Sequence, residues 1–335
     1  MSHFPVGVAC APWPVKRLTT NLQPDCAARY GGGRPLHQTL LLHTASLAGR
    51  TLDFMTLSLT SLSVRHPGAD QSALQQLTLA IDQGEQVALI GPSGAGKTTL
   101  LHTLALAQQP TTGTLMAFGG NPWALNSSQR HVLRGRLFLA PQTPPLPPRQ
   151  RVVTAVLAGR LSQWRFWRAV ASLVRPTEPQ LAFDALARFN LQHKLYARVD
   201  RLSGGERQRC GMARLLVSDA RLLLVDEPLS ALDPTLAVQT MDVLQAEATR
   251  RNATLICSLH QVALARAHFP RIVGLRDGRI VFDARREDVT DLMVDALYQN
   301  AGNAAVLAAT RFKVDEDGAT LANGNAPTVV LVPRC

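Results

Sequence analysis

The sequence predicts an α/β fold built around a mostly parallel β-sheet. Two observations predict it. Along the second half of the chain, short apolar runs of strand length alternate with stretches of helical periodicity, and strands that alternate with helices form parallel sheets. Earlier, an apolar strand at 86–90 leads into a glycine-rich loop and then a helix from 98 to about 107. In open sheets of this kind, ligands bind at the carboxyl ends of the strands.

The other expected elements follow in order along the chain. Residues 55–64 alternate between polar residues and leucine or valine, which predicts a strand with one buried face. Beyond a proline-rich loop at 141–148, residues from about 152 to 202 have the spacing of helices. The remaining expected elements are strands at 77–81, 221–225, 254–258 and 271–275, and helices near 236–250 and from 261 onwards.

The chain divides into a globular region at 55–300, an N-terminal extension at 1–54 and a C-terminal tail at 301–335. The extension contains prolines and three consecutive glycines with little periodicity, so we expect it to be poorly ordered and dispensable. Within the globular region, the helical stretch is expected to form a subdomain over about 143–202. No apolar run approaches the roughly 18 residues that a membrane-spanning helix needs.

Composition and charge narrow the function classes. Hydrophobic residues make up 46% and charged residues 18% of the chain, which excludes disordered and fibrous proteins. Five scattered cysteines argue for a reducing compartment and against a disulfide framework or structural zinc. Of the net charge of +11, +10 lies in one acid-free segment at 86–177, which holds one lysine and nine arginines. Such a field suits nucleotides, nucleic acid or an anionic membrane surface.

Residues 91–98 match the phosphate-binding pattern G-x-x-x-x-G-K-[ST] at every fixed position. Glycines let backbone N–H groups surround phosphates, and the N-terminus of the following helix faces them. We therefore expect a nucleoside triphosphate, with Lys97 on its β- and γ-phosphates and the Thr98 hydroxyl on Mg²⁺. The expected phosphate-binding loop, or P-loop, comprises Gly91, Pro92, Ser93, Gly94, Ala95, Gly96, Lys97, Thr98 and Thr99.

Two adjacent acids, Asp226 and Glu227, follow the apolar run 222–225. We expect this strand to lie beside the strand of the P-loop, with its acids at the ligand-binding edge of the sheet. There, Asp226 would hold the Mg²⁺ shell, and Glu227 would polarise the attacking water as a general base. A solvated turn is the alternative interpretation of two adjacent acids.

Residues 202–209 read Leu-Ser-Gly-Gly-Glu-Arg-Gln-Arg, so Ser203, Gly204 and Gly205 open a helix and form a second N–H cradle. One chain holds its γ-phosphate on its own P-loop, so a second cradle suggests a site completed across a dimer. With these motifs the chain resembles the ATP-binding subunits of ABC transporters from about Met55 to about Tyr298. The resemblance implies a RecA-like P-loop NTPase core with an antiparallel β subdomain and an inserted helical subdomain.

The resemblance also implies roles for residues outside these motifs. Gln142, after a strand at 137–140, matches the glutamine that touches Mg²⁺ and water, and His260 matches the histidine that contacts the γ-phosphate. Asp233 ends the loop that crosses the dimer interface in the family. His66 stands where the family usually has an aromatic residue that stacks on adenine, which implies that the imidazole takes this place.

A member of this family would be an ATPase whose hydrolysis of ATP, with Mg²⁺, drives transport. Its implied partners are transmembrane permease subunits, a second copy of itself and, indirectly, a periplasmic substrate-binding protein. It would lie peripherally on the cytoplasmic face of the inner membrane. The segments 157–161, 258–266 and 271–283 resemble the phosphonate-importer ATPases, which implies import of phosphonates or a related phosphorus oxyanion.

Two alternatives stay open: import of another small solute, and a non-transport ABC ATPase that acts on nucleic acid. The latter usually carries two cassettes or long coiled-coil inserts, and this chain has neither, so no nucleic-acid partner is expected. Within the helical insert, the cluster Trp164–Arg168 is expected to lie beside the permease docking groove. Ordinary packing within the insert is the alternative for this cluster.

Overall fold

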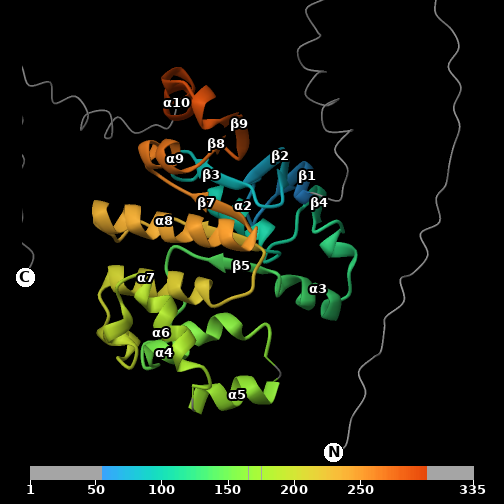
Figure 1. Cartoon of the computed structure of the whole chain (residues 1–335). Helices are drawn as coiled ribbons and strands as arrows, with labels where there is room; N and C mark the ends of the chain where they lie inside the picture. Colours follow the sequence, from blue (N-terminus) through green and yellow to red (C-terminus); the bar gives the residue numbers. More distant parts are fainter. Residues whose placement is uncertain (1–54, 165, 175, 300–335) are drawn as a thin grey trace, which may run out of the picture. The chain divides into compact units, whose positions relative to one another are not determined.

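The computed structural model describes residues 55–299 except 165 and 175, so the expectations for 1–54, 301–335 and Arg165 lie outside the described residues. The described chain forms two sheets (Figure 1). An antiparallel sheet has the order β2-β1-β4, with β1 at Met55–Val64, β2 at Leu74–Asp82 and β4 at Thr112–Ala117. The second sheet has the order β5-β6-β7-β3-β8-β9 and is parallel except for its last pair. Its strands are β3 (Gln86–Ile90), β5 (Leu137–Ala140), β6 (Leu222–Asp226), β7 (Thr254–Ser258), β8 (Arg271–Arg276) and β9 (Arg279–Arg285).

Helices surround the larger sheet, which confirms the predicted α/β class with its antiparallel and helical parts. In the described part of the chain, none of them is long and apolar enough to span a membrane. Sequence analysis missed β4, β9 and the helices α3 and α10. The α-helices are α2 (Lys97–Leu104), α3 (Ser127–Arg134), α4 (Val152–Leu157), α5 (Phe166–Val174), α6 (Pro179–Ala187), α7 (Gly204–Leu216), α8 (Pro234–Arg251), α9 (Val262–His268) and α10 (Asp291–Tyr298).

Strand β1 shows how an irregular pattern still buries one face. Its apolar residues recur at Leu57 and Leu59, then slip by one position to Leu62 and Val64, and all four are buried. The register with β2 shifts between Leu59 and Leu62, where Ser61 adopts a positive φ of 46°. This bulge absorbs the extra residue, so the strand keeps its apolar face on the core.

The central sheet is buried on both faces because its strands contribute alternate residues to two cores. On β6, Leu222 and Leu224 pack with the antiparallel sheet and α2, while Leu223 and Val225 pack with the helices on the other side. Continuous apolar strands of this kind are expected where both faces of a parallel sheet are covered. This burial fixes where each strand ends, and therefore where the polar residues after it emerge.

The helical insert packs on the core that contains Leu223 and Val225 of β6. Helices α4 and α6 contact α7, which begins at Gly204, just beyond the expected subdomain boundary. Figure 1 shows α4, α5 and α6 below α7, on the side away from the antiparallel sheet. The tryptophan cluster divides here: Trp164 is buried under the guanidinium of Arg168, whereas Trp167 on α5 is 78% exposed. Trp164 therefore shows the alternative of ordinary packing within the insert, whereas the exposed Trp167 leaves the place beside a docking groove as a prediction.

The expected neighbourhood of β6 is also wrong. Strand β6 does not lie beside the P-loop strand β3, because β7 pairs with both and separates them. The order follows the double winding of the sheet, in which parallel connections place later strands between earlier ones. The interposed strand brings its own last residue, Ser258, to the ligand-binding edge.

Several arginines of the acid-free segment form contacts inside the fold. Arg130 on α3 donates to the carbonyl oxygens of Pro122 and Leu125, in the turn before that helix. It also stacks on Trp123, with 4.8 Å from its guanidinium carbon to the ring centre. Arg134 donates to the carbonyl oxygen of Leu106, just after α2, at 2.7 Å, and Arg136 stacks on Phe118 at 4.2 Å. The charge of this segment is thus partly used to hold α3 and the antiparallel sheet together.

A buried carboxylate, Glu247, ties α8 to the helical insert. It is 3% exposed and pairs with Arg250 and Arg251 on its own helix and with Arg188 at the end of α6. Arg251 also donates to carbonyl oxygens at the end of α7. Burial alone would raise the pKa of the Glu247 carboxyl, but the hydrogen bond from Arg250 and the charge of Arg251 lower it to about 2.

We therefore predict that Glu247→Gln lowers the free energy of unfolding by about 3 kcal/mol at pH 7, because it leaves Arg251, whose side chain is only 12% exposed, without its counter-charge. The pKa of this carboxyl is lower in the folded state than its ordinary value of 4.5. Its stabilisation is thus fully present above about pH 4.5 and is lost as the pH falls toward 2. Urea unfolding of wild type and Glu247→Gln between pH 3 and 7 measures the difference in their free energies of unfolding.

The matched control is Asp242→Asn, which neutralises an exposed acid on the same helix. It should change the free energy of unfolding by less than about 0.5 kcal/mol. A difference between wild type and Glu247→Gln that stays constant down to pH 3 would show that packing, and not charge, makes Glu247 important.

Candidate active site

The P-loop joins the end of β3 to the start of α2, and its backbone requires glycine. Gly91 and Gly96 have φ values of 150° and 100°. A Cβ on Gly91 would lie 2.0 Å from the carbonyl oxygen of Leu275, and one on Gly96 would lie 2.8 Å from that of Ala73. Gly94, with φ of 79°, has open space at the same position. The loop is therefore packed against the protein on one side and open on the other, as a cradle for phosphates must be.

Lys97 is the first residue of α2 and lies inside this loop. Its ammonium donates to the carbonyl oxygens of Gly91 at 2.7 Å and Pro92 at 3.1 Å, and its side chain is 6% exposed. Burial lowers the pKa of Lys97, while the nearby carboxylates of Glu227 and Asp226 oppose that shift. The first turn of α2 contains no acid, so the positive end of the helix dipole is left for a bound anion.

Asp226 and Ser258 end the neighbouring strands β6 and β7 and lie directly opposite each other in register. The Ser258 hydroxyl donates to Asp226 Oδ1 at 2.5 Å and accepts the backbone N–H of Glu227 at 2.9 Å. Asp226 is 3% exposed. One buried hydroxyl therefore orients the carboxylate expected at Mg²⁺ and also fixes the backbone of the residue after it.

The Glu227 carboxylate lies between two residues that the sequence predicted. Gln142 follows β5 and donates from Nε2 to Glu227 Oε2 at 2.7 Å. His260 follows β7, and its Nε2 pairs with Glu227 Oε1. The strands β5, β6 and β7 are neighbours in the sheet, so their carboxyl ends bring these three side chains to one point. Glu227 is thereby held with one partner on each carboxylate oxygen.

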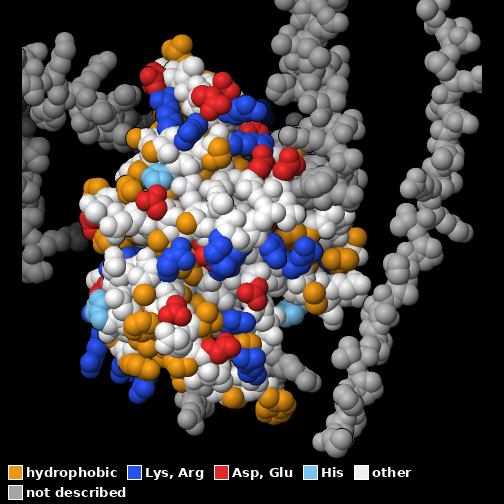
Figure 2. Space-filling view, viewed as in Figure 1, with side chains coloured by type: hydrophobic (Ala, Val, Ile, Leu, Met, Phe, Trp, Pro, Cys, Tyr) orange, Lys and Arg blue, Asp and Glu red, His pale blue; other side chains and the backbone are white. Residues whose placement is uncertain are grey.

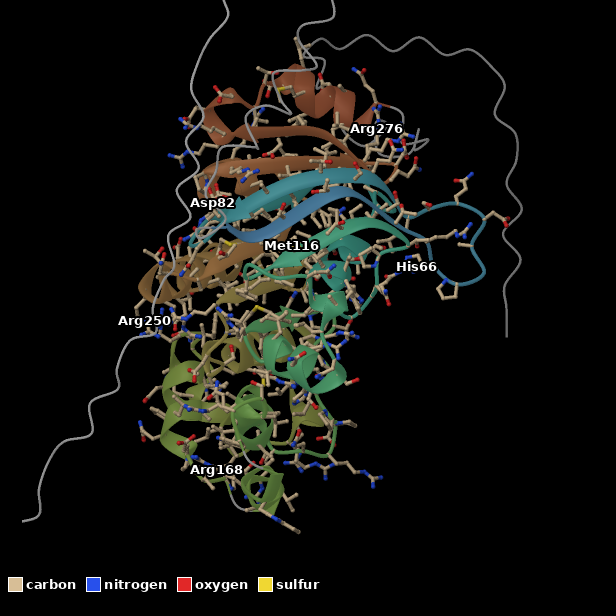
Figure 3. All side chains as sticks on the ribbon, turned by 90° about the vertical axis from the view of Figure 1, so that its right-hand side faces the viewer. His66, Asp82, Met116, Arg168, Arg250 and Arg276 are labelled. Atoms are coloured by element: carbon tan, nitrogen blue, oxygen red, sulfur yellow. The ribbon has the colours of Figure 1, made fainter. Side chains whose placement is uncertain are left out.

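His66 lies against the P-loop helix. Its Nε2 is 3.2 Å from the Thr99 hydroxyl, and its Nδ1 is 3.2 Å from the amide nitrogen of Gln108. Figure 3 shows it on the side of the molecule from which the loop between β1 and β2 projects, opposite Arg250. The structure therefore brings His66 beside the nucleotide-binding loop, and stacking on adenine stays a prediction.

The second cradle lies elsewhere on the chain. Ser203 caps α7 through a reciprocal capping box with Glu206. The atoms nearest to a Cβ on Gly204 or Gly205 belong to the loop between β6 and α8. Asp233 caps α8 by accepting the N–H of Leu236 at 3.0 Å. In the described residues, these contacts stay within α7, α8 and the loop before α8. The expected binding of a nucleotide by the second cradle and Asp233 therefore stays a prediction.

The residues of this edge fit a nucleoside triphosphate with Mg²⁺. The open glycine loop, the buried lysine and the uncompensated helix end all favour phosphate oxygens. Mg²⁺ prefers oxygen ligands from a few side chains and from the phosphates of its substrate. Such oxygens are available on the hydroxyl of Thr98, the amide of Gln142 and the carboxylate of Asp226. In the described part of the chain, no group of three or more His, Cys, Asp or Glu side chains could hold a metal ion alone.

Sequence reasoning missed two residues of this site, Ser258 and Gln208. Ser258 is the last residue of an apolar strand, so its place at the carboxyl edge was a signal that could have been used. Gln208 is a polar residue on the buried face of α7, 3% exposed. Buried polar side chains nearly always have hydrogen-bond partners. Those of Gln208 are backbone atoms of Glu227 and Ala231, which the sequence does not place near it.

We predict that Ser258→Ala lowers the affinity of the nucleotide-bound site for Mg²⁺. The change removes the bond that orients Asp226, and removal of such outer partners costs about 10- to 100-fold in metal affinity. ATP binding in the presence of EDTA should stay within about twofold of wild type, because the P-loop is untouched. Titration with Mg²⁺ at fixed ATP, followed by calorimetry, separates the two effects.

Ser218→Ala is the matched control, because Ser218 is also buried and its hydroxyl donates only to the carbonyl of Leu215 at the end of α7. It should leave the Mg²⁺ titration unchanged. An equal Mg²⁺ affinity in Ser258→Ala and wild type would show that Asp226 needs no such orientation.

Comparison with known proteins agrees with this geometry. The family model described as "ABC transporter" matches residues 74–230. Phosphonates import ATP-binding protein PhnC 2 of Albidiferax ferrireducens is 56% identical over 247 residues, which cover 73% of this chain and 89% of the relative. The protein of the same name from Pseudomonas aeruginosa is 48% identical over 281 residues, covering 84% of this chain and 100% of the relative.

Solved structures share the fold. The dimeric ATP-binding cassette MJ0796, in a post-hydrolysis state with ADP and Pi, has a TM-score of 0.60 at 23% identity, covering 69% of this chain and 98% of that one. For cbiO1 of Clostridium perfringens, the TM-score is 0.60 at 20% identity, with 76% and 99% covered. Together with relatives that are matched over nearly their whole length, these findings show that the chain belongs to the ABC transporter family, as an ATP-binding subunit that hydrolyses ATP.

Proposed function

We propose that this chain energises the import of phosphonates or a related phosphorus oxyanion. The observation that carries the proposal is the identity of 48–56% to proteins named for phosphonate import, over nearly their whole length. The segments 157–161, 258–266 and 271–283 lie outside the general ATPase motifs, so their likeness to phosphonate-importer ATPases carries subfamily information. The substrate itself would be selected by a permease and a periplasmic substrate-binding protein.

In hydrolysis, the chain's residues would act from three directions on one bound ATP. Lys97 would leave the carbonyl oxygens of its own loop and bind the β- and γ-phosphates. Bound Mg²⁺ would neutralise charge on the phosphates, held by Thr98, Gln142 and Asp226. Glu227 would accept a proton from the attacking water, and His260 would contact the γ-phosphate.

The second N–H cradle would serve a second copy of the chain. Ser203, Gly204 and Gly205 open α7 next to the loop that ends at Asp233, and none of their contacts described above reaches the P-loop of the same chain. Two copies facing each other would place each cradle on the other's nucleotide. Two ATP molecules would then lie between the copies, and hydrolysis would reopen the dimer.

The subunit would work on the cytoplasmic face of the inner membrane, attached peripherally to transmembrane permease subunits. Trp167 offers an anchor on the exposed side of α5, in the helical insert. Figure 2 shows apolar side chains grouped over this lower part of the molecule. We propose that the exposed side of α5 lies beside the permease docking groove, with Trp164 supporting it from inside.

Glu227→Gln should reduce ATP hydrolysis by about 10²- to 10⁴-fold, the usual contribution of a positioned acid or base. ATP binding should persist, because the P-loop and Asp226 are unchanged, and an ATP-bound dimer should accumulate. Steady-state phosphate release and size-exclusion chromatography with ATP measure these effects. Lys97→Ala is the contrasting variant, since it should weaken nucleotide binding instead. Near-normal turnover in Glu227→Gln would remove Glu227 from the role of general base.

The substrate class is tested by growth on a phosphonate as sole phosphorus source after deletion of the gene. Growth and phosphonate uptake should fail and should return with the wild-type gene but not with the Glu227→Gln gene. Growth on inorganic phosphate is the control. Unimpaired phosphonate uptake in a deletion strain without a second importer would contradict the substrate and leave the ATPase activity untouched.

A further inference from the structure

The conformation of Glu227 needs an explanation that its carboxylate partners do not give. Its φ is 48°, in the left-handed region that non-glycine residues seldom adopt. Pro228 follows it and restricts its backbone further. Such a conformation persists only where the surroundings hold it, so the bonds to the Glu227 backbone decide where its carboxylate lies.

Both backbone groups of Glu227 are bonded to side chains from other elements. Its N–H donates to Ser258 on β7 at 2.9 Å. Its carbonyl oxygen accepts from Gln208 Nε2 on α7 at 2.8 Å and, less closely, from the Ser230 hydroxyl at 3.3 Å. The Gln208 amide is therefore the close partner on the carbonyl side.

Gln208 holds a second point in the same loop. Its Oε1 accepts the backbone N–H of Ala231 at 3.0 Å, and its Nε2 lies 3.3 Å from the Ser230 hydroxyl. The side chain is 3% exposed, so loss of these bonds would leave buried polar groups unpaired. One amide thus fastens the whole turn from Glu227 to Ala231 onto α7.

The helix that carries Gln208 also carries the second N–H cradle. Gln208 lies about one turn after Gly205 on α7. A Cβ on Gly205 would lie 2.9 Å from the carbonyl oxygen of Ala231, so the start of α7 already packs tightly on the same turn. A shift of α7 must therefore move this turn, and Glu227 with it.

We propose that Gln208 is a positioning residue for hydrolysis, which fixes the backbone of Glu227 and makes its carboxylate depend on the position of α7. This inference rests on the proposed role of Glu227 as general base and on the proposed contact of Ser203–Gly205 with the partner's nucleotide. Engagement of α7 by the nucleotide of one site is then transmitted, through Gln208, to the general base of the other.

The main test is Gln208→Met, which keeps the length of the side chain and removes its hydrogen bonds. ATP affinity should stay within about twofold, since no P-loop residue is touched, while kcat should fall by about 10- to 100-fold because a misplaced base is inefficient. The Hill coefficient for ATP should fall toward 1. Gln245→Met is the matched control, because Gln245 on α8 also bonds to two neighbouring elements, at Gln86 and His268. It should lower the melting temperature and leave kcat within about twofold.

A double variant separates positioning from general destabilisation. If Gln208 acts through Glu227, then adding Gln208→Met to Glu227→Gln should change the remaining single-turnover rate by less than about threefold. Multiplication of the two single losses would overturn the inference. Gln208→Glu offers a second variant, because it keeps an oxygen for Ala231 and places an oxygen against the Glu227 carbonyl. It should reproduce the loss of kcat.

The outcomes distinguish this inference from the proposed function. Normal turnover in Glu227→Gln would contradict the role of Glu227 itself. Slow turnover in Glu227→Gln together with a normal kcat in Gln208→Met and Gln208→Glu would overturn the positioning role alone. Loss of the folding transition in both Gln208 variants, with Gln245→Met folded, would also overturn it by showing that Gln208 is needed for the fold.

Discussion

The pairing of Asp226 with Ser258 is the interaction on which the rest of the site depends. The two residues end adjacent parallel strands in register, and a single hydroxyl orients the carboxylate of one and the backbone of Glu227. Parallel strands end on the same edge, so residues far apart in the sequence meet there without a dedicated scaffold. Gln142 and His260 reach the Glu227 carboxylate for the same reason.

Burial of the sheet on both faces keeps this edge in place. Alternate residues of each strand belong to different cores, so a shift of one residue in register would expose apolar side chains to the wrong neighbours. Buried polar side chains also join the layers around the sheet. Glu247 joins α8 to the end of α6, and Gln208 joins α7 to the turn after β6. Both are buried polar side chains. Glu247 connects the helical insert to α8, and Gln208 connects α7, on which the insert packs, to the turn that carries Glu227.

Local motifs were predictable from the sequence because their chemistry lies in neighbouring residues. The P-loop needs glycines, a lysine and a hydroxyl in one short run, and the structure confirms its place between β3 and α2. The position of Gln142 and His260 beside Glu227 was predictable only through the family resemblance. Strand order was not predictable locally, so β6 was placed next to β3 when β7 separates them. β9 was missed although its residues alternate in burial, because no buried run marks it.

Ser258 and Gln208 were missed because their partners are distant in sequence and their bonds go mainly to backbone atoms. Gln208 bonds to residues 19 to 23 positions away, and no motif spacing signals such contacts. Trp164 shows the opposite difficulty. Its pattern with Arg168 resembles a surface cluster, but the indole lies under the guanidinium and inside the insert. Burial of a single aromatic is decided by tertiary packing, which a short sequence pattern does not contain.

The central claim is that each active site combines the P-loop, Asp226 and Glu227 of one chain with the second cradle of another. It is tested most directly by mixing two inactive variants. Lys97→Ala disables a P-loop, and Gly204→Asp places a negative charge in the cradle at a position where a Cβ meets ordinary packing distances. Mixed dimers would hold one site with both lesions and one site with neither. The account predicts that each variant alone is inactive and that an equal mixture recovers ATPase activity clearly above either component. Roughly a quarter of wild-type activity is the upper bound, since half of the random dimers carry one intact site of two and the general base of that site lacks an engaged second site. An equal mixture as inactive as its components would contradict a site shared between two copies.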